Sequence, residues 1–367
     1  MTSRSFPFAC LLVKSPVTDV QESRRMSQST KIPATLIPGD GIGPEIVESV
    51  VSVLDALGSP FEWDSQYAGM AAIARVGDPL PRETIQSIHH NKLALKGPLT
   101  TPTGGGYRSV NVQLRKEFEL FANVRPALTL IPGGRFEDVD ITLIRENLDG
   151  FYAAFEHYMP IGDDPHAVAM CAGFNTRTGC HRIIRYAFEY AVQNGRKKVT
   201  LVHKANILKA LTGIFLEAGK EIAKEYEGRI AFEERIVDAC AMQLVLDPGR
   251  FDVIVTTNLF GDILSDLIAG LIGGLGLAPG GNIGKQAAIF EAVHGSAPDI
   301  AGKGIANPLA LMLAAAMMLD HVGKIDLATR LRNAIRITTL EDGIRTPDLG
   351  GTAKTRELTQ ALISRIG

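Results

Sequence analysis

From residue 32 onward, short apolar runs of strand length alternate with longer segments of helical periodicity. This alternation constrains the fold most, because it is typical of an α/β architecture with a largely parallel sheet. The expected strands are residues 34–37, 93–95, 141–144, 199–202 and 253–255. The expected helices are residues 46–57, 111–121, 181–194, 205–224 and a long one that opens with Asn307-Pro308 as N-cap and first residue.

The 367 residues are enough for two domains or one large α/β unit. A net charge of −2 gives no electrostatic footprint for nucleic acid or a membrane, and the longest apolar run, 308–319, suits a core or subunit-interface helix. Four scattered cysteines predict a reduced compartment and no zinc site. Residues 1–30 are expected to be a disordered extension. A cleaved targeting segment is a weak alternative, because the acidic residues Asp19 and Glu22 count against it.

The stretch 251–266 carries the first chemical signal. After the expected strand 253–255 and a polar turn, Asp262 and Asp266 stand four residues apart near the start of an apolar helix. Their carboxylates therefore face the same way, and a hard divalent cation with oxygen ligands would turn their repulsion into attraction. The alternative is that the acids only complement the helix dipole, which suits Asp262 better than Asp266.

Two glycine-rich segments come earlier. The segment 39–43 lacks the spacing of a dinucleotide-binding fingerprint and is expected to be a tight turn. The loop 97–111 offers glycines, hydroxyls and an amide to an oxyanion, and Arg115, Arg125 and Arg145 follow it. Three guanidinium groups suit a polycarboxylate, because each can pair with a carboxylate in a bidentate fork. Taken singly, each arginine is more often a surface residue.

Four further side chains are candidate functional residues, and two of them also have a plain structural interpretation. Lys204 directly follows a strand, where it could act as a base or be a solvated strand end. Asp238 could be a third carboxylate or a plain N-cap, and Tyr152 lies in an aromatic segment. Asp299 lies in a loop of small residues, where an acid could accept from both ribose hydroxyls and repel a 2′-phosphate.

Five motifs together resemble the metal-dependent β-decarboxylating dehydrogenases, the isocitrate and isopropylmalate dehydrogenase family. They are Ile37-Pro-Gly-Asp-Gly-Ile-Gly-Pro-Glu45, Arg145-Glu-Asn, Val202-His-Lys-Ala-Asn206, Asn258-Leu-Phe-Gly-Asp-Ile-Leu-Ser-Asp266 and His294-Gly-Ser-Ala-Pro-Asp-Ile-Ala-Gly302. Each is weak alone, but five in the family's order are highly specific, and the resemblance covers nearly all of residues 31–367. The pattern Ser109-x-Asn111-x-x-x-Arg115 is similar to the isocitrate branch, and Asp299-Ile300 to its NAD-using version.

The resemblance implies oxidative decarboxylation of isocitrate to 2-oxoglutarate and CO₂, with NAD⁺ reduction and dependence on Mg²⁺ or Mn²⁺. It makes Tyr152 the general acid and Lys204, supplied by the neighbouring protomer, an aid to removal of the hydroxyl proton. The implied metal ligands are Asp262, Asp266 and the neighbour's Asp238, and the implied substrate ligands are Ser109, Asn111, Arg115, Arg125 and Arg145. The implied cofactor-binding residues are Thr101, Asn206, Glu291, His294, Gly295, Ser296, Ala297, Asp299, Ile300 and Asn307.

The resemblance also implies an isopropylmalate dehydrogenase-like three-layer fold without the usual Rossmann fingerprint. Residues 31–120 and 273–367 would form a large cofactor domain, and 121–272 a small domain with a dimer-forming clasp. We expect a homodimer with shared active sites, or a larger assembly, in the cytoplasm, or in the mitochondrial matrix if residues 1–30 are a targeting segment. The alternatives are an isopropylmalate, homoisocitrate or tartrate dehydrogenase and a non-catalytic regulatory subunit.

Overall fold

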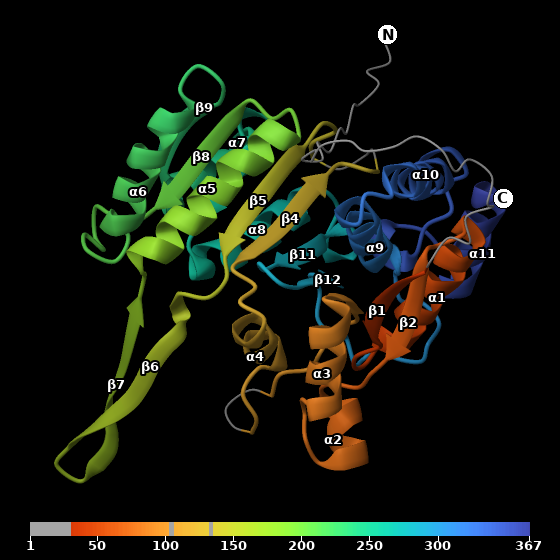
Figure 1. Ribbon diagram of the computed structural model, residues 1–367, viewed down its shortest axis with the longest axis horizontal. Coiled ribbons are helices and arrows are strands. Elements are labelled where there is room, and N and C mark those ends of the chain that lie inside the picture. The colour runs from red at the N-terminus through yellow and green to blue at the C-terminus, as the bar shows by residue number, and fades with distance from the viewer. Residues whose placement is uncertain (1–30, 103–105, 132–134) are drawn as a thin grey trace, which may run out of the picture.

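The computed structural model describes residues 31–102, 106–131 and 135–367, so the expectations for residues 1–30 lie outside the described residues. One ten-stranded sheet runs through the molecule (Figure 1). From edge to edge its strands are β2 (Phe61–Ser65), β1 (Ile32–Ile37), β3 (Leu93–Lys96), β12 (Ala288–Ala292), β11 (Pro279–Ile283), β4 (Ala122–Leu128), β5 (Asp140–Glu146), β10 (Val253–Thr256), β8 (Lys198–His203) and β9 (Ala231–Ile236). Only the pairs β12–β11, β11–β4 and β4–β5 are antiparallel, so the predicted largely parallel sheet is confirmed.

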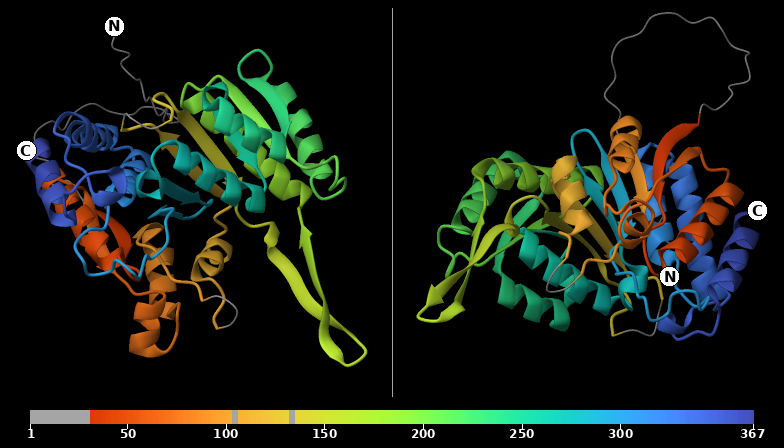
Figure 2. Two further views of the ribbon diagram at one scale, coloured as in Figure 1. Left: turned by 180° about the vertical axis from the view of Figure 1, so that it is seen from behind. Right: turned by 90° about the horizontal axis from the view of Figure 1, so that it is seen from below.

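Helices cover both faces of this sheet (Figure 1, Figure 2). One face carries α1 (Gly43–Leu57), α9 (Leu309–His321), α10 (Ile325–Arg336) and α11 (Thr355–Ile366) over one half, and α5 (Arg177–Gln193) and α6 (Gly213–Ala223) over the other. The opposite face carries α3 (Arg82–Asn91) and α4 (Val110–Glu117) on one side, and α7 (Val237–Leu246) and α8 (Asn258–Leu271) on the other. The short helix α2 (Met70–Val76) precedes α3. The predicted three-layer α/β fold is therefore confirmed.

Local sequence explains the central elements well. The strands β5, β8 and β10 are buried along almost their whole length because helices cover them on both faces. Helix α1 has Pro44 in its first turn and ends at Gly58, whose φ of 75° allows the left-handed cap. Helix α9 is buried along most of its length within this chain, so the apolar run 308–319 is a core helix.

Three helix boundaries lie four or more residues from their expected positions. Helix α4 ends at Glu117 instead of residue 121, because Glu119 has a φ of 46° and turns the chain into β4. Helix α6 begins at Gly213 instead of residue 205, and turns precede it, in which the Thr212 hydroxyl accepts from the Lys204 N–H at 3.2 Å. Helix α5 begins at Arg177 instead of residue 181, because the Thr176 hydroxyl accepts from the Gly179 N–H and caps its start.

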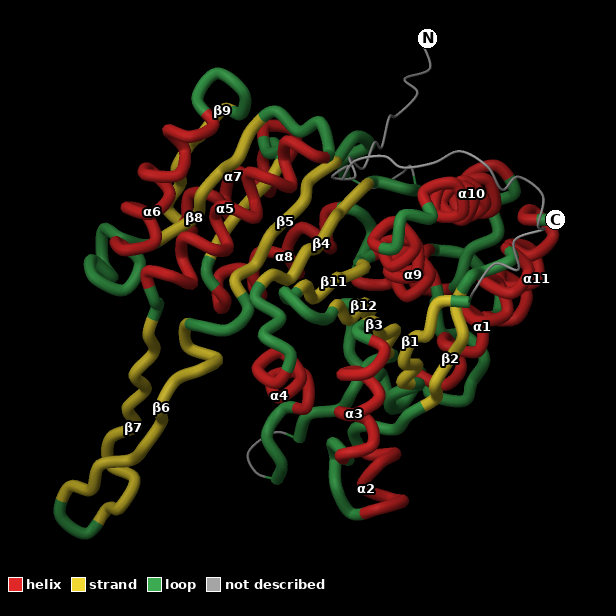
Figure 3. The backbone as a smooth tube through the Cα atoms, in the orientation of Figure 1, coloured by secondary structure: helices red, strands yellow, loops and turns green. Residues whose placement is uncertain are grey.

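A two-stranded arm of β6 (Gly150–Ile161) and β7 (Asp164–Phe174) projects from the body (Figure 2, Figure 3). It exposes large apolar side chains, among them Phe155 (75%) and Ile161 (66%). Such exposure on a protruding hairpin indicates a surface for another chain. In the described part of the chain, no helix is long and apolar enough to cross a membrane.

The proposed large and small domains share the one sheet. Residues 31–120 and 273–367 supply β1, β2, β3, β11 and β12, whereas 121–272 supply β4, β5, β8, β9, β10 and the arm. The two sets meet where β11 pairs with β4. The division into two domains stays a prediction.

Candidate active site

Strand register brings polar residues that are distant in sequence into one row. Asn282 of β11 pairs with Asn123 of β4, and Asn123 pairs with Arg145 of β5. Paired residues share a face, and Arg125 lies on the same face two positions along β4. All four side chains are buried on the face that carries α4 and α8, so the site forms between these helices.

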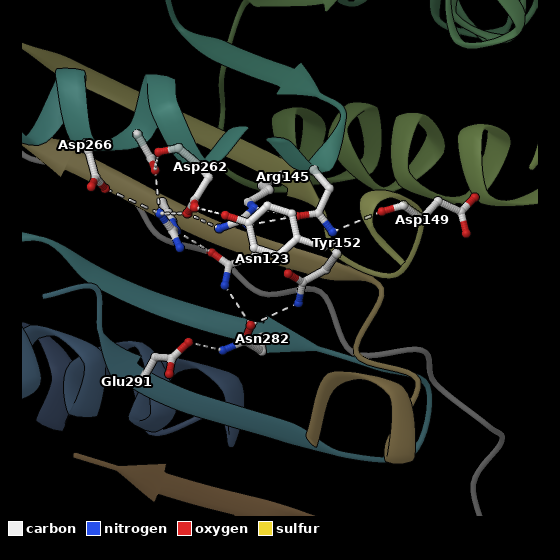
Figure 4. Close-up of polar contacts among 12 residues, drawn as sticks. Asn123, Arg145, Asp149, Tyr152, Asp262, Asp266, Asn282 and Glu291 are labelled. Carbon is white, nitrogen blue, oxygen red and sulfur yellow. Dashed lines mark hydrogen bonds and ion pairs between the residues drawn. The ribbon is translucent and has the colours of Figure 1, made fainter. Parts of the chain in front are cut away.

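Arg145 is held in one orientation from three sides (Figure 4). Its Nε and Nη2 donate to Asn258 Oδ1 at 3.1 and 2.7 Å, and its Nη1 donates to Asp262. The Tyr152 ring lies 4.9 Å from the guanidinium carbon. A Cβ at Gly261 would come within 2.5 Å of Arg145 Cγ, so only glycine lets α8 pass this close.

The carboxylates of Asp262 and Asp266 on α8 face the same way, as their spacing predicted. Both point toward the arginine cluster, which consists of Arg115, Arg125 and Arg145. Arg125 Nη1 lies 3.5 Å from Asp262 Oδ1 and 3.7 Å from Asp266 Oδ1. Burial opposes ionisation of Asp262, but the charges of the three arginines and the hydrogen bond from Tyr152 together lower the pKa of this carboxyl. Partial burial raises the pKa of Asp266. The Tyr152 hydroxyl donates to Asp262 Oδ2, and burial together with this bond raises the pKa of Tyr152, so the phenol stays protonated at neutral pH.

Arg115 differs from Arg125 and Arg145 because no carboxylate of the described residues lies within ion-pair distance of it, although Glu291 and Asp262 act on it electrostatically from further away. Its side chain is only 8% exposed, yet within the described ranges it makes no hydrogen bond or ion pair, and its Nε is buried without a partner. Burial and then the charge of Arg145 lower its pKa to about 10, which still leaves it a cation. Asn111 on the same helix has a buried Oδ1 that finds no partner among the described residues, and Ser109 precedes that helix as its N-cap.

The oxygen donors fit a hard divalent cation only in part. Asp262 and Asp266 supply two carboxylates on one helix face, the donor type that Mg²⁺ and Mn²⁺ prefer. Among the residues that the structure describes, no three His, Cys, Asp or Glu side chains gather as a metal site. One chain therefore brings two of the three expected carboxylates together.

The third carboxylate belongs to a separate pair. Asp238, in the first turn of α7, accepts from Lys204 Nζ, and this bond lowers the pKa of Asp238. Asn206 is exposed in the turns directly after Lys204. Asp238 lies inside α7 instead of at its N-cap, Ile236, so the plain N-cap interpretation is wrong.

The loop 294–302, which is expected to bind the cofactor, packs against the glycine-rich turn 39–43. Ile42 N donates to Ser296 O at 2.9 Å, and the Ser296 and Thr100 hydroxyls lie 2.8 Å apart. Gly41 has a φ of 58°, and a Cβ there would lie 1.9 Å from Ser296 O. The predicted tight turn is confirmed, and its glycine is needed to seat this loop. Ala297 has a φ of 39°, a strained value for alanine, and Asp299 is exposed beyond it, where Ile300 N donates back to Ala297 O.

The remaining expected cofactor residues surround that loop. Glu291 ends β12 and lies 2.8 Å from Lys96 Nζ. His294 Nε2 is buried without a partner in the described structure, and burial lowers the pKa of His294, which favours a neutral ring. Asn307 donates to Asp348 at 2.9 Å, and its Oδ1 accepts from the Leu309 N–H. Helix α9 begins at Leu309, one residue later than expected. Gly295 and Thr101 are exposed.

Several polar residues of the site were missed from the sequence. Asn258 accepts from Arg145, Asn123 accepts from Arg125, and Asn282 accepts from Asn123. Asn258 had a signal, because it is the last polar residue of the turn after β10 and opens a quoted motif. Asn123 and Asn282 carry no such signal, since only strand register makes them neighbours.

A three-layer α/β fold with clustered arginines opposite paired carboxylates defines a class of proteins that take small polyanions together with a cation. Comparisons with known proteins narrow this class. The model of the family "Isocitrate/isopropylmalate dehydrogenase" matches residues 33–362. The chain belongs to this family, and the resemblance inferred from its motifs is confirmed.

Individual relatives agree with the family. Isocitrate dehydrogenase [NAD] catalytic subunit 5, mitochondrial, of Arabidopsis thaliana is 48% identical over 93% of this chain and 90% of that protein. A mitochondrial regulatory subunit of NAD-dependent isocitrate dehydrogenase from Dictyostelium discoideum is also 48% identical, over 93% of this chain and 94% of that protein. The crystal structure of isocitrate dehydrogenase from Methylococcus capsulatus matches with a TM-score of 0.88 and 57% identity over 91% of this chain and 99% of that one.

Proposed function

We propose that this protein oxidatively decarboxylates isocitrate to 2-oxoglutarate and CO₂, with reduction of NAD⁺ and dependence on Mg²⁺ or Mn²⁺. The observation that carries the proposal is Arg115, a buried cation that makes no ion pair or hydrogen bond in the described structure. An unpaired buried charge is costly, so an anionic ligand is the natural partner for it. The neighbouring Arg125 and Arg145 supply further donors, as a tricarboxylate requires.

In this proposal, Ser109 and Asn111 make the site specific for isocitrate over related substrates such as isopropylmalate. Both lie at the start of the helix that carries Arg115, and the Asn111 oxygen is buried without a partner in the described residues. A hydroxyl and an amide there would hold a third carboxylate. An isopropyl group would instead call for apolar residues at these positions.

Asp262, Asp266 and the Asp238 of a second copy would hold the cation. A bound divalent cation supplies electrophilic stabilisation of the enolate that remains after CO₂ leaves. Tyr152 would then donate its phenol proton to the carbon, and its raised pKa keeps that proton available. Lys204 of the second copy would assist removal of the 2-hydroxyl proton while hydride passes from C2 to NAD⁺. The presence of both Tyr152 and Lys204 argues against a non-catalytic regulatory subunit.

The arm supports a dimer with shared sites. Tyr152 lies near the start of β6, and further along the arm Phe155, Tyr158 and Ile161 are exposed, where a second copy would cover them. Lys204 and Asp238 pair with each other, and in the described part of one chain no hydrogen bond or ion pair links them to Tyr152 or Asp262. We infer that each site combines the two groups from different chains. Relatives named as mitochondrial fit a matrix location, and a cytoplasmic one stays our first expectation.

A substrate panel tests the activity. Purified protein with NAD⁺ and Mn²⁺ should form NADH with isocitrate, and a chelator should abolish the absorbance increase. Turnover of isopropylmalate, homoisocitrate or tartrate in place of isocitrate would move the protein to another branch of the family. Binding of isocitrate without any turnover would indicate a regulatory subunit.

Arg115→Gln should raise the KM for isocitrate by about 10- to 100-fold, because hydrogen bonds to a charged group contribute roughly 1.5–3 kcal/mol. The ligand-free protein should melt at the same temperature or higher, since the substitution removes a buried charge that makes no ion pair or hydrogen bond in the described structure. Steady-state kinetics and thermal melts measure the two effects. Lys116→Gln, one residue along the helix and exposed, is the control. A destabilised variant with normal KM would make Arg115 a structural residue.

Wild-type protein should prefer NAD⁺ over NADP⁺ in kcat/KM, because Asp299 would repel a 2′-phosphate. Replacing Asp299→Lys together with Ile300→Tyr should shift that ratio toward NADP⁺ by about 10- to 100-fold, since a charge-assisted contact replaces a repulsion. Paired kinetics with both cofactors give the ratio. Asp326→Lys, an exposed acid in the first turn of α10, controls for the added charge. A wild type that prefers NADP⁺ would contradict the assignment of this loop.

A further inference from the structure

A line of buried polar side chains crosses four strands at the centre of the sheet. It joins Lys96 of β3, Glu291 of β12, Asn282 of β11, and Asn123 and Arg125 of β4. Lys96 Nζ lies 2.8 Å from Glu291. Asn282 Nδ2 donates to Glu291 Oε1 at 2.7 Å, and Asn123 Nδ2 donates to Asn282 Oδ1 at 2.6 Å (Figure 4). Arg125 Nε donates to Asn123 Oδ1 at 2.7 Å. Buried polar chains of this kind persist only when each member is satisfied.

The two ends of this line fix the direction of every hydrogen bond in it. An ionised Glu291 can only accept, so Asn282 must turn its amide nitrogen toward it. Arg125 can only donate, so Asn123 must turn its amide oxygen toward Arg125. Each asparagine then presents the complementary group to the other. Neither amide can flip without placing two donors or two acceptors against each other.

Asn282 is the branching point of the line. Its Oδ1 also accepts from Asn147 Nδ2 at 3.0 Å, and its Nδ2 also lies 3.4 Å from Ile289 O. The side chain is 3% exposed, so water does not replace a lost partner easily. Removing its amide group would therefore take a donor from Glu291 on one side and an acceptor from Asn123 on the other.

We propose that Asn282 is a positioning residue that holds Arg125 in line for the substrate and links this arginine to Glu291 at the cofactor loop. With its Nε edge bound to Asn123, Arg125 can direct only its Nη edge toward Asp262 and Asp266, 3.5 and 3.7 Å away. A ligand carboxylate would meet that edge. The terms substrate and cofactor loop rest on the proposed function, whereas the line of hydrogen bonds does not.

Asn282→Asp gives the line a titratable member of the same shape. The groups that face it are Glu291 and, around Glu291, the cations Lys96 and Arg115. Burial opposes ionisation of Glu291, but these two cations lower its pKa to about 2, so Glu291 stays ionised. The introduced carboxyl group then reproduces the Asn282 donor only while it is protonated, because two carboxylates in contact cannot both ionise easily.

The test compares kcat/KM for isocitrate across pH in wild type, Asn282→Asp, Asn282→Leu and Asn194→Asp. Relative to wild type, the Asn282→Asp variant should be close to normal at acid pH and lose about 10- to 100-fold as pH rises, mainly through the KM for isocitrate. Asn282→Leu should be impaired at every pH. Asn194→Asp, which adds the same charge at the C-cap of α5, should parallel wild type.

An Asn282→Asp profile parallel to wild type would overturn the proposal, and so would a normal KM in Asn282→Leu. If wild type itself fails to oxidise isocitrate, the proposed function fails separately. Crystal structures of Asn282→Asp at acid and alkaline pH then decide the positioning role. Loss of the Arg125–Asn123 hydrogen bond only at alkaline pH supports it, and an unchanged Arg125 at both pH values contradicts it.

Discussion

Tyr152→Phe should leave the fold intact and lower kcat for isocitrate oxidation by about 10²- to 10⁴-fold, the range typical for loss of a general acid. The substitution removes one hydroxyl from a side chain that is 38% exposed and leaves the ring beside Arg145. The KM for isocitrate should change little, because Arg115, Arg125 and Arg145 remain. NADH absorbance at saturating substrate, together with a thermal melt, measures both expectations.

Tyr158→Phe is the matched control for this result. Tyr158 lies on the same arm, is 59% exposed and contacts the ring of His166 instead of the arginine cluster. Its loss of a hydroxyl should leave kcat unchanged. If Tyr152→Phe keeps near-normal turnover, Tyr152 is not the proton donor. The arrangement with Asp262 would then only stabilise the start of the arm.

Heterodimers of a Tyr152→Phe chain and a Lys204→Met chain should recover about half of wild-type activity, although each homodimer is nearly inactive. If each site takes Tyr152 from one chain and Lys204 from the other, such a heterodimer contains one intact site and one doubly altered site. Two affinity tags on coexpressed chains isolate the mixed species. Steady-state kinetics per dimer give the recovered fraction.

The same two substitutions placed on one chain supply the control. A heterodimer of a doubly substituted chain with a wild-type chain has one lesion in each shared site and should be nearly inactive. If each chain instead built its own site, the outcomes would be reversed: this second heterodimer would keep half of the activity and the first would have none. The pair of heterodimers therefore separates shared from self-contained sites.

Local sequence was enough for the class of fold. The buried strand at 253–255, the turn after it and the i,i+4 acids of α8 all depend on periodicity and spacing within a few residues. The termination of α4 and the late start of α6 depend on contacts that residue pattern does not encode. Glu119 adopts a positive φ to lead into β4, and Thr212 closes turns on Lys204.

Sequence by itself determined the α/β architecture, the tight turn at Gly41, the acidic face of α8 and the family, because each is written in neighbouring residues or ordered motifs. Only the tertiary structure placed Asn123 against Asn282, 159 residues apart, and left Arg115 buried without an ion pair or hydrogen bond among the described residues. Strand register decides the first and helix packing the second. Both arise from burial of the whole chain, in which each side chain's partners depend on segments far away in sequence.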